Sequence, residues 1–167
     1  MGGQSVEIES LTTESGLATT IAALQFANWG RSTGYGTVEE YERFLCDAAR
    51  SQRIPAVLVA KRAGTFLGSV NLLAHEMTTR PSLSPWLAQL FVIGEERGRG
   101  TGSALVRACL ARFAELGFAR VHLYTASATT LPGYYMALGW KPIEEIEYLG
   151  KMRTVMAFDF PGNVPGE

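Results

Sequence analysis

Three glycines at alternate positions, Gly98, Gly100 and Gly102, stand between two apolar segments of different pattern. Residues 86–92 before them are almost all apolar, which is typical of a strand covered on both faces. The residues after them repeat apolar side chains at helical spacing. Glycine allows backbone conformations closed to other residues, and the first N–H groups of a helix attract phosphates. The segment therefore predicts an anion site, with a glycine-rich turn that binds nothing as the alternative.

Two common phosphate motifs do not fit this segment. The dinucleotide motif G-x-G-x-x-G needs a third glycine where Ser103 stands. The nucleotide-triphosphate motif needs a Lys-Ser or Lys-Thr pair, which does not follow. What remains is Arg97-x-x-Gly100-x-Gly102 between a strand and a helix. The pyrophosphate of a coenzyme is the anion we expect there, with Arg99 adding a charged contact.

The rest of the chain predicts the elements that position this segment. Alternating or continuous apolar residues predict strands, and apolar residues at intervals of three and four predict helices. Thr37 and Glu40 form a capping-box pattern, Thr13 or Ser15 could cap the first helix, and Ile54-Pro55 should end the second. The expected order is a strand at 6–9, helices at 17–28 and 37–53, strands at 56–61, 66–73 and 86–92, a helix up to Gly117, a strand at 121–125, a helix at 132–138, and a hairpin of 143–148 with 154–160.

This order predicts a mixed α/β fold with one largely antiparallel sheet, a single parallel strand pair in its middle, and helices on both faces. The 167 residues are expected to form one domain, 1–167, with an ordered core of about 5–160 and a frayed end after Pro161. The net charge of −1 gives no reason to expect nucleic acid or an anionic membrane as a partner.

Targeting and metal-binding signals are also not expected. Residues 1–6 lack the pattern of a signal peptide, and no run approaches the roughly 20 apolar residues of a membrane helix, so a cytoplasmic protein is the default. Cys46 and Cys109 have neither disulfide nor metal spacing, and both are expected to be buried helix residues. We expect no metal cofactor.

A second motif lies downstream of the next strand. Residues 134–140, Tyr-Tyr-Met-Ala-Leu-Gly-Trp, resemble the pattern F-Y-x-x-L-G-F. Together with Arg97-x-x-Gly100-x-Gly102, the chain resembles the GCN5-related N-acetyltransferase (GNAT) superfamily from about residue 6 to 160. Residues 79–87 and the final hairpin look like a bacterial branch of small single-domain members.

The resemblance implies that acetyl-CoA is the co-substrate. The backbone of Leu90, Phe91 and Val92 would hold the pantetheine arm, on a strand that splays from the next one. An N–H group near Phe91 would polarise the thioester carbonyl. Tyr135 would be the general acid that protonates the leaving thiolate. The pyrophosphate loop would consist of Arg97, Gly98, Arg99, Gly100, Thr101, Gly102 and Ser103.

The sequence departs from the family pattern in two places. Many members carry an Asn seven residues before the tyrosine, where this chain has Ala128, so that contact is either lost or supplied by Ser127 or Thr129. Some members carry a catalytic Glu on the central strand, where the only polar side chain is Gln89, which cannot act as a base. The remaining candidates for a base are His75, Glu76, His122 and Tyr124, or water that relays the proton.

The implied activity is that of an acyltransferase, an acetyl-CoA-dependent N-acetyltransferase. It would move an acetyl group to a primary amine of a small molecule or peptide by direct attack in a ternary complex. A non-catalytic acyl-CoA-binding or regulatory module on the same fold is the alternative, and a homodimer stays open. Aromatic residues that could line the acceptor site are Trp29, Tyr35, Trp86 and Tyr148.

Overall fold

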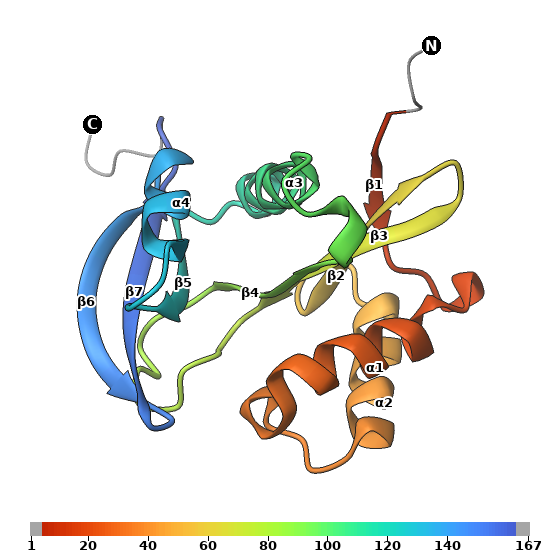
Figure 1. Ribbon diagram of the computed structural model, residues 1–167, viewed down its shortest axis with the longest axis horizontal. Coiled ribbons are helices and arrows are strands. Elements are labelled where there is room, and N and C mark those ends of the chain that lie inside the picture. The colour runs from red at the N-terminus through yellow and green to blue at the C-terminus, as the bar shows by residue number, and fades with distance from the viewer. Residues whose placement is uncertain (1–4, 163–167) are drawn as a thin grey trace. The chain divides into compact units, whose positions relative to one another are not determined.

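The computed structural model describes residues 5–162, so the expectations for the first four residues and for those after Gly162 lie outside it (Figure 1). The predicted order of elements is confirmed. Along the chain run β1 (Glu7–Ser10), α1 (Leu17–Trp29), α2 (Val38–Arg50), β2 (Ala56–Arg62), β3 (Thr65–Leu73), β4 (Trp86–Val92), α3 (Thr101–Glu115), β5 (Arg120–Ala126), α4 (Leu131–Ala137), β6 (Lys141–Tyr148) and β7 (Lys151–Asp159).

The strands form one sheet in the order β1-β2-β3-β4-β5-β7-β6. The pair β4–β5 is parallel, with Trp86 opposite His122. The pairs β1–β2, β2–β3, β5–β7 and β6–β7 are antiparallel. A mixed, largely antiparallel sheet with one central parallel pair is therefore confirmed.

The residues group into two compact units. Unit 1 contains the residues up to Leu72 together with Gln89–Cys109. Unit 2 contains Leu73–Ala88 together with the residues from Leu110 onward. The organisation of residues 1–167 as a single domain stays a prediction.

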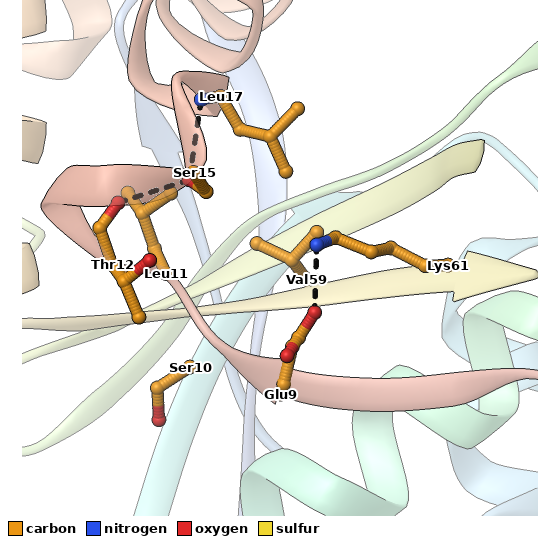
Figure 2. A pocket seen from close by; sticks show the side chains of 8 residues that line it. All are labelled: Glu9, Ser10, Leu11, Thr12, Ser15, Leu17, Val59 and Lys61. Carbon is orange, nitrogen blue, oxygen red and sulfur yellow. Dashed lines mark hydrogen bonds and ion pairs between the residues drawn. The ribbon is translucent and has the colours of Figure 1, made fainter. Parts of the chain in front are cut away.

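The helices of unit 1 begin and end at local signals. The Thr37 hydroxyl accepts a hydrogen bond from the Glu40 N–H at 3.2 Å, so the capping box is confirmed. α2 ends at Arg50, earlier than predicted, because Ser51 is already extended. At α1 the cap position is Gly16, not Thr13 or Ser15, although the Ser15 hydroxyl accepts from the Leu17 N–H at 3.2 Å (Figure 2). Gly16 takes a left-handed conformation, with φ of 73°, that side chains disfavour.

The core of unit 1 lies on both faces of β3. On one face, apolar residues of α1, α2 and β2 pack together; Ile21, Tyr41, Leu45, Val57 and Val59 are buried there. On the other face, Gly68 of β3 lies against Leu105 of α3. Figure 1 shows α1 and α2 on one side of β2 and β3 and α3 on the other. In unit 1 helices thus cover both faces, as predicted.

The core of unit 2 is built around Trp86, which is fully buried and packs with Met77, Tyr148 and Val155. The β6–β7 hairpin pairs Tyr148 with Lys151 across its turn, close to the predicted position. The loop before β4 is tied to β6 because Arg80 donates to both carboxylate oxygens of Glu144. Within residues 5–162, none of the helices is long and apolar enough to cross a bilayer.

Candidate active site

The glycine segment joins β4 to α3 within unit 1. Gly98 and Gly100 both have left-handed backbones, with φ of 78° and 89°. A side chain at either position would meet no atom within 4 Å, so glycine is required there by conformation rather than by space. The Ala104 N–H donates to the Gly100 carbonyl at 3.0 Å. Thr101 and Gly102 come before Ala104 in the chain, so their N–H groups lie at the positive end of the helix, where an anion is stabilised.

A buried carboxylate fixes the shape of this segment. Only 6% of Glu96 is exposed, and its carboxylate accepts hydrogen bonds from Arg62 at 2.8 Å and from the Thr101 hydroxyl at 3.3 Å. The hydrogen bond from Arg62 is the main reason why the pKa of Glu96 is lowered. Glu96 therefore stays ionised near neutral pH and ties the start of α3 to the end of β2.

The two arginines of the segment have different partners. Arg97 turns back and donates from Nε to the Val92 carbonyl at 3.1 Å, at the end of β4. The side chain of Arg99 is 65% exposed and lies 3.6 Å from the Glu96 carboxylate. Arg99 therefore presents its charge to solvent beside the helix start, whereas Arg97 holds the strand end against the loop.

The strand that precedes the loop departs from regular geometry at one residue. Gln89 has a left-handed backbone, with φ of 48°, although it is not glycine. Leu90, Phe91 and Val92 follow it and are half-buried. The Ile93 N–H donates to the Leu67 carbonyl of β3 at 2.9 Å. At Gly68 a β-carbon would lie only 2.5 Å from the Phe91 carbonyl oxygen, so β3 and β4 approach closely there.

Tyr135 lies on α4, in unit 2, and is 7% exposed. Its ring packs edge-on against Tyr134 and Trp140, with centroids 5.1 and 6.1 Å away. The hydroxyls expected to replace the missing Asn have local partners. Thr129 donates to the Ala126 carbonyl at 2.8 Å, and Ser127 shares a 2.8 Å hydrogen bond with Thr154.

The predicted acceptor-site residues fall in both units. In unit 1, Trp29 is half-buried at the end of α1, and Tyr35 packs against the rings of Tyr41 and Phe44. In unit 2, Trp86 has no exposed surface, and its indole donates to the Leu83 carbonyl. This burial argues against Trp86 as a wall of the site. Tyr148 is 7% exposed, and its hydroxyl accepts from the Thr78 N–H at 3.1 Å.

Two candidate bases have environments that decide their charge. Burial, with the nearby Glu76 and Tyr148, raises the pKa of Tyr124, so this phenol stays protonated and is unsuited to act as a base. Burial likewise lowers the pKa of His122, so its imidazole is neutral near neutral pH. His122 Nδ1 lies 3.1 Å from the Pro85 carbonyl, which can only accept, so Nδ1 carries the proton.

Within residues 5–162, no group of three or more His, Cys, Asp and Glu side chains is arranged to hold a metal ion. A hollow of about 40 Å³ lies where β1 leads to α1, beside the Glu9–Lys61 ion pair (Figure 2). It has room for about one water molecule, so it cannot hold a coenzyme.

Comparison with known proteins gives one family match and many similar structures. The sequence model described as "Acetyltransferase (GNAT) family" matches residues 21–140. A GCN5-related N-acetyltransferase from Kribbella flavida is 18% identical with a TM-score of 0.72, over 93% of this chain and 98% of that one. No curated protein matches the sequence.

Two further structures were solved with a coenzyme. YncA from Salmonella typhimurium, with its cofactor acetyl-CoA, is 12% identical with a TM-score of 0.70, over 97% of this chain and 98% of that one. PaiA N-acetyltransferase from Thermoplasma acidophilum, in complex with coenzyme A, is 20% identical with a TM-score of 0.64, over 94% and 100%. At such identities these likenesses show the fold alone.

The sequence did not identify several residues that shape this site. Glu96 directly precedes Arg97, the first residue of the glycine motif, and its partner Arg62 is 34 residues away. Gln25 and Asn71, which contact Gln89, lie 64 and 18 residues from it. The only local signal that could have pointed to these contacts of Gln89 was Gln25, a buried glutamine on the apolar face of α1.

Proposed function

The chain belongs to the acetyltransferase (GNAT) family, and on that premise we propose that it transfers the acetyl group of acetyl-CoA to a primary amine of a small molecule or peptide. One observation carries the proposal. Two left-handed glycines, Gly98 and Gly100, lie just before the start of α3 in the segment that follows the end of β4, all within unit 1. A coenzyme whose extended arm is attached to a pyrophosphate matches such an arrangement.

The coenzyme would bind along this path. The backbone of Gly98–Ser103 would donate N–H groups to the pyrophosphate, and Arg99 would add positive charge. The backbone of Leu90, Phe91 and Val92 would pair with the amide-containing pantetheine arm. YncA and PaiA N-acetyltransferase were solved with acetyl-CoA and coenzyme A respectively, which supports a coenzyme of this type here.

The reaction would be a direct displacement. The lone pair of a neutral amine attacks the thioester carbonyl, a C–N bond forms, and the C–S bond breaks. The amine loses one proton, to water or to one of the candidate bases His75, Glu76 and His122, since neither Tyr124 nor the polar residue of β4, Gln89, is a base. Tyr135 gives a proton to the leaving thiolate, and a phenol suits this role because its ordinary pKa is near 10. Holding both reactants in place supplies much of the rate increase.

The alternative is a module that binds acyl-CoA without catalysis. The side chain of Gln89, the one polar group on the central strand, is hydrogen-bonded to Asn71 and offers no base. A panel of amines, amino acids, antibiotics and peptides, assayed for release of the coenzyme thiol, separates the two functions. Turnover of any amine supports the enzyme, whereas binding of acetyl-CoA without thiol release from the whole panel supports the module.

Two variants test the assigned roles. Gly100→Val should abolish acetyl-CoA binding measured by calorimetry, because valine disfavours a φ of 89°. Gly36→Ala is a matched control, since a β-carbon there makes only an ordinary contact at 3.5 Å. Tyr135→Phe should lower the rate while leaving the affinity for acetyl-CoA nearly unchanged. Binding of acetyl-CoA by Gly100→Val with the affinity of the wild type would reject the glycine segment as the pyrophosphate site. Turnover by Tyr135→Phe at the rate of the wild type would reject Tyr135 as the general acid.

A further inference from the structure

A group of polar side chains is buried in unit 1 between α1, α2 and the sheet. Gln25, Ser69 and Asn71 have no exposed surface, and Tyr41 and Gln89 are 1% and 8% exposed. Polar groups at this depth are tolerated when hydrogen bonds satisfy them. They come from α1, α2, β3 and β4. Because three of the five side chains are amides, we call this group the amide network.

The amide network holds Gln89 at two points. The side-chain nitrogen of Gln25 donates to the main-chain carbonyl of Gln89 at 3.3 Å. The side-chain nitrogen of Asn71 donates to Oε1 of Gln89 at 3.2 Å.

Gln25 and Asn71 are themselves fixed by the other members. The Gln25 nitrogen also faces Ser69 Oγ and Asn71 Oδ1, each at 3.1 Å. The Tyr41 hydroxyl donates to Gln25 Oε1 and lies 3.0 Å from the Asn71 nitrogen.

This restraint falls on the one residue of β4 whose backbone is left-handed. A φ of 48° is unfavourable for a side chain such as glutamine and persists where the surroundings impose it. A single left-handed residue in a strand turns the next peptide group, as in a β-bulge. The amide network is therefore placed to maintain a local turn of β4, the strand that precedes the proposed pyrophosphate loop of residues 97–103.

The held carbonyl sets the direction of the next N–H group. In a trans peptide the carbonyl of one residue and the N–H of the next point in opposite directions. Because the Gln89 carbonyl points to Gln25 on α1, the Leu90 N–H points away from α1. The Ile93 N–H is bonded to β3, and N–H groups alternate along a regular strand, so that of Val92 points away from β3.

We infer that Gln25 is a positioning residue: through the Gln89 carbonyl it aims the Leu90 N–H at the thioester carbonyl of bound acetyl-CoA. This rests on the proposed function and narrows the expected donor near Phe91 to Leu90. Gln25 touches no reacting atom. It acts through the backbone, which can stabilise the developing negative charge only if the donor is already aimed.

Infrared difference spectroscopy with acetyl-CoA labelled with ¹³C at the carbonyl tests this without knowledge of the acceptor. A donated hydrogen bond lowers the carbonyl stretching frequency relative to free acetyl-CoA. Gln25→Met keeps the length of the side chain but cannot donate, so the lowered frequency should return to the free value while calorimetric affinity changes less than about threefold. Where an amine substrate is known, kcat should fall about tenfold or more, because a full oxyanion donor contributes roughly 10²–10³.

Two controls separate positioning from stability. Asn28→Ala removes a side-chain amide from the same helix that donates to Leu24 and not to β4, so the frequency should stay at the wild-type value. Adding Gln89→Gly to Gln25→Met should restore part of the shift, because glycine adopts a left-handed backbone without strain.

The outcomes are distinct. Failure of the wild type to bind acetyl-CoA overturns the proposed function and this inference with it. Binding with a frequency that is unshifted in the wild type, or equally shifted in Gln25→Met, overturns the inference alone. If Gln25→Met does not fold, Gln89→Gly should keep the shift and Gln89→Val should lose it, because β-branched residues disfavour the left-handed region. Equal spectra for these two variants overturn the inference.

Discussion

Replacing Gly68 by alanine should displace β4, the strand proposed to bind the pantetheine arm, although Gly68 itself is not a proposed contact of the coenzyme. Gly68 lies on β3 opposite the end of β4, and its backbone is not in the left-handed region, so alanine is compatible with its conformation. The difficulty is space alone. A β-carbon there would lie 2.5 Å from the Phe91 carbonyl oxygen and 3.2 Å from Cα of Val92, both of them backbone atoms.

The size of the effect follows from these distances. Ordinary van der Waals contact begins at 3.4 Å, so β3 and β4 would have to separate by about 0.9 Å. That movement would lengthen the 2.9 Å hydrogen bond from Ile93 to Leu67 to about 3.8 Å, beyond hydrogen-bonding range. Loss of one hydrogen bond and the strain of overpacking together lower the free energy of unfolding by about 2–4 kcal/mol.

Thermal unfolding and calorimetry measure this prediction. For a chain of this length, the melting temperature should fall by roughly 5–15 °C. Affinity for acetyl-CoA should fall as well, because Phe91 and Val92 are the proposed partners of the pantetheine arm. Gly133→Ala on α4 is the control, since a β-carbon there meets nothing within 4 Å and alanine favours a helix. A Gly68→Ala variant with the melting temperature and affinity of the wild type would refute the close approach of the two strands.

Three further predictions concern single interactions. Glu96→Gln should lower both the melting temperature and the affinity for acetyl-CoA at neutral pH. The difference from the wild type should shrink in acid, because the pKa of Glu96 is lowered by Arg62 and this stabilisation is lost as the carboxylate protonates; a difference that does not depend on pH would contradict this. The free energy of unfolding of His122→Asn should depend less on pH than that of the wild type between about pH 7.5 and 5.5. In the wild type the pKa of His122 is lowered by burial, so the unfolded chain takes up the proton first and the fold is destabilised in acid. Denaturant titrations at several pH values would contradict this if the free energy of unfolding changed equally with pH in both proteins. Thr37→Ala should destabilise the protein by about 1 kcal/mol in denaturant titrations, whereas Thr13→Ala, which caps no α-helix, should have little effect.

Local patterns in the sequence were enough to predict most of the fold. Apolar periodicity identified each strand and helix, and Thr37 with Glu40 marked the start of α2, because such signals act between neighbouring residues. The start of α1 was predicted at Thr13 or Ser15 because both can cap, but Gly16 holds that position.

The glycine segment was found for the same local reason, and its placement between β4 and α3 agrees with the sequence pattern. What the sequence could not provide are pairings across the fold. Glu96 with Arg62 and Gln89 with Gln25 depend on which strands and helices become neighbours, and single residue types do not encode this. The left-handed Gln89 was equally invisible, because glutamine normally signals no special backbone conformation.

The interleaved course of the chain bears on how the protein can be synthesised. Unit 1 is completed by Gln89–Cys109, after Leu73–Ala88 has been contributed to unit 2. On the ribosome, Gln25 and Asn71 emerge before Gln89, the residue whose backbone and side chain they bond. A fragment that stops at Leu72 would bury those amides without their partner on β4. No single cut separates the units, so truncation or circular permutation should preserve the link from β3 through β4 to α3.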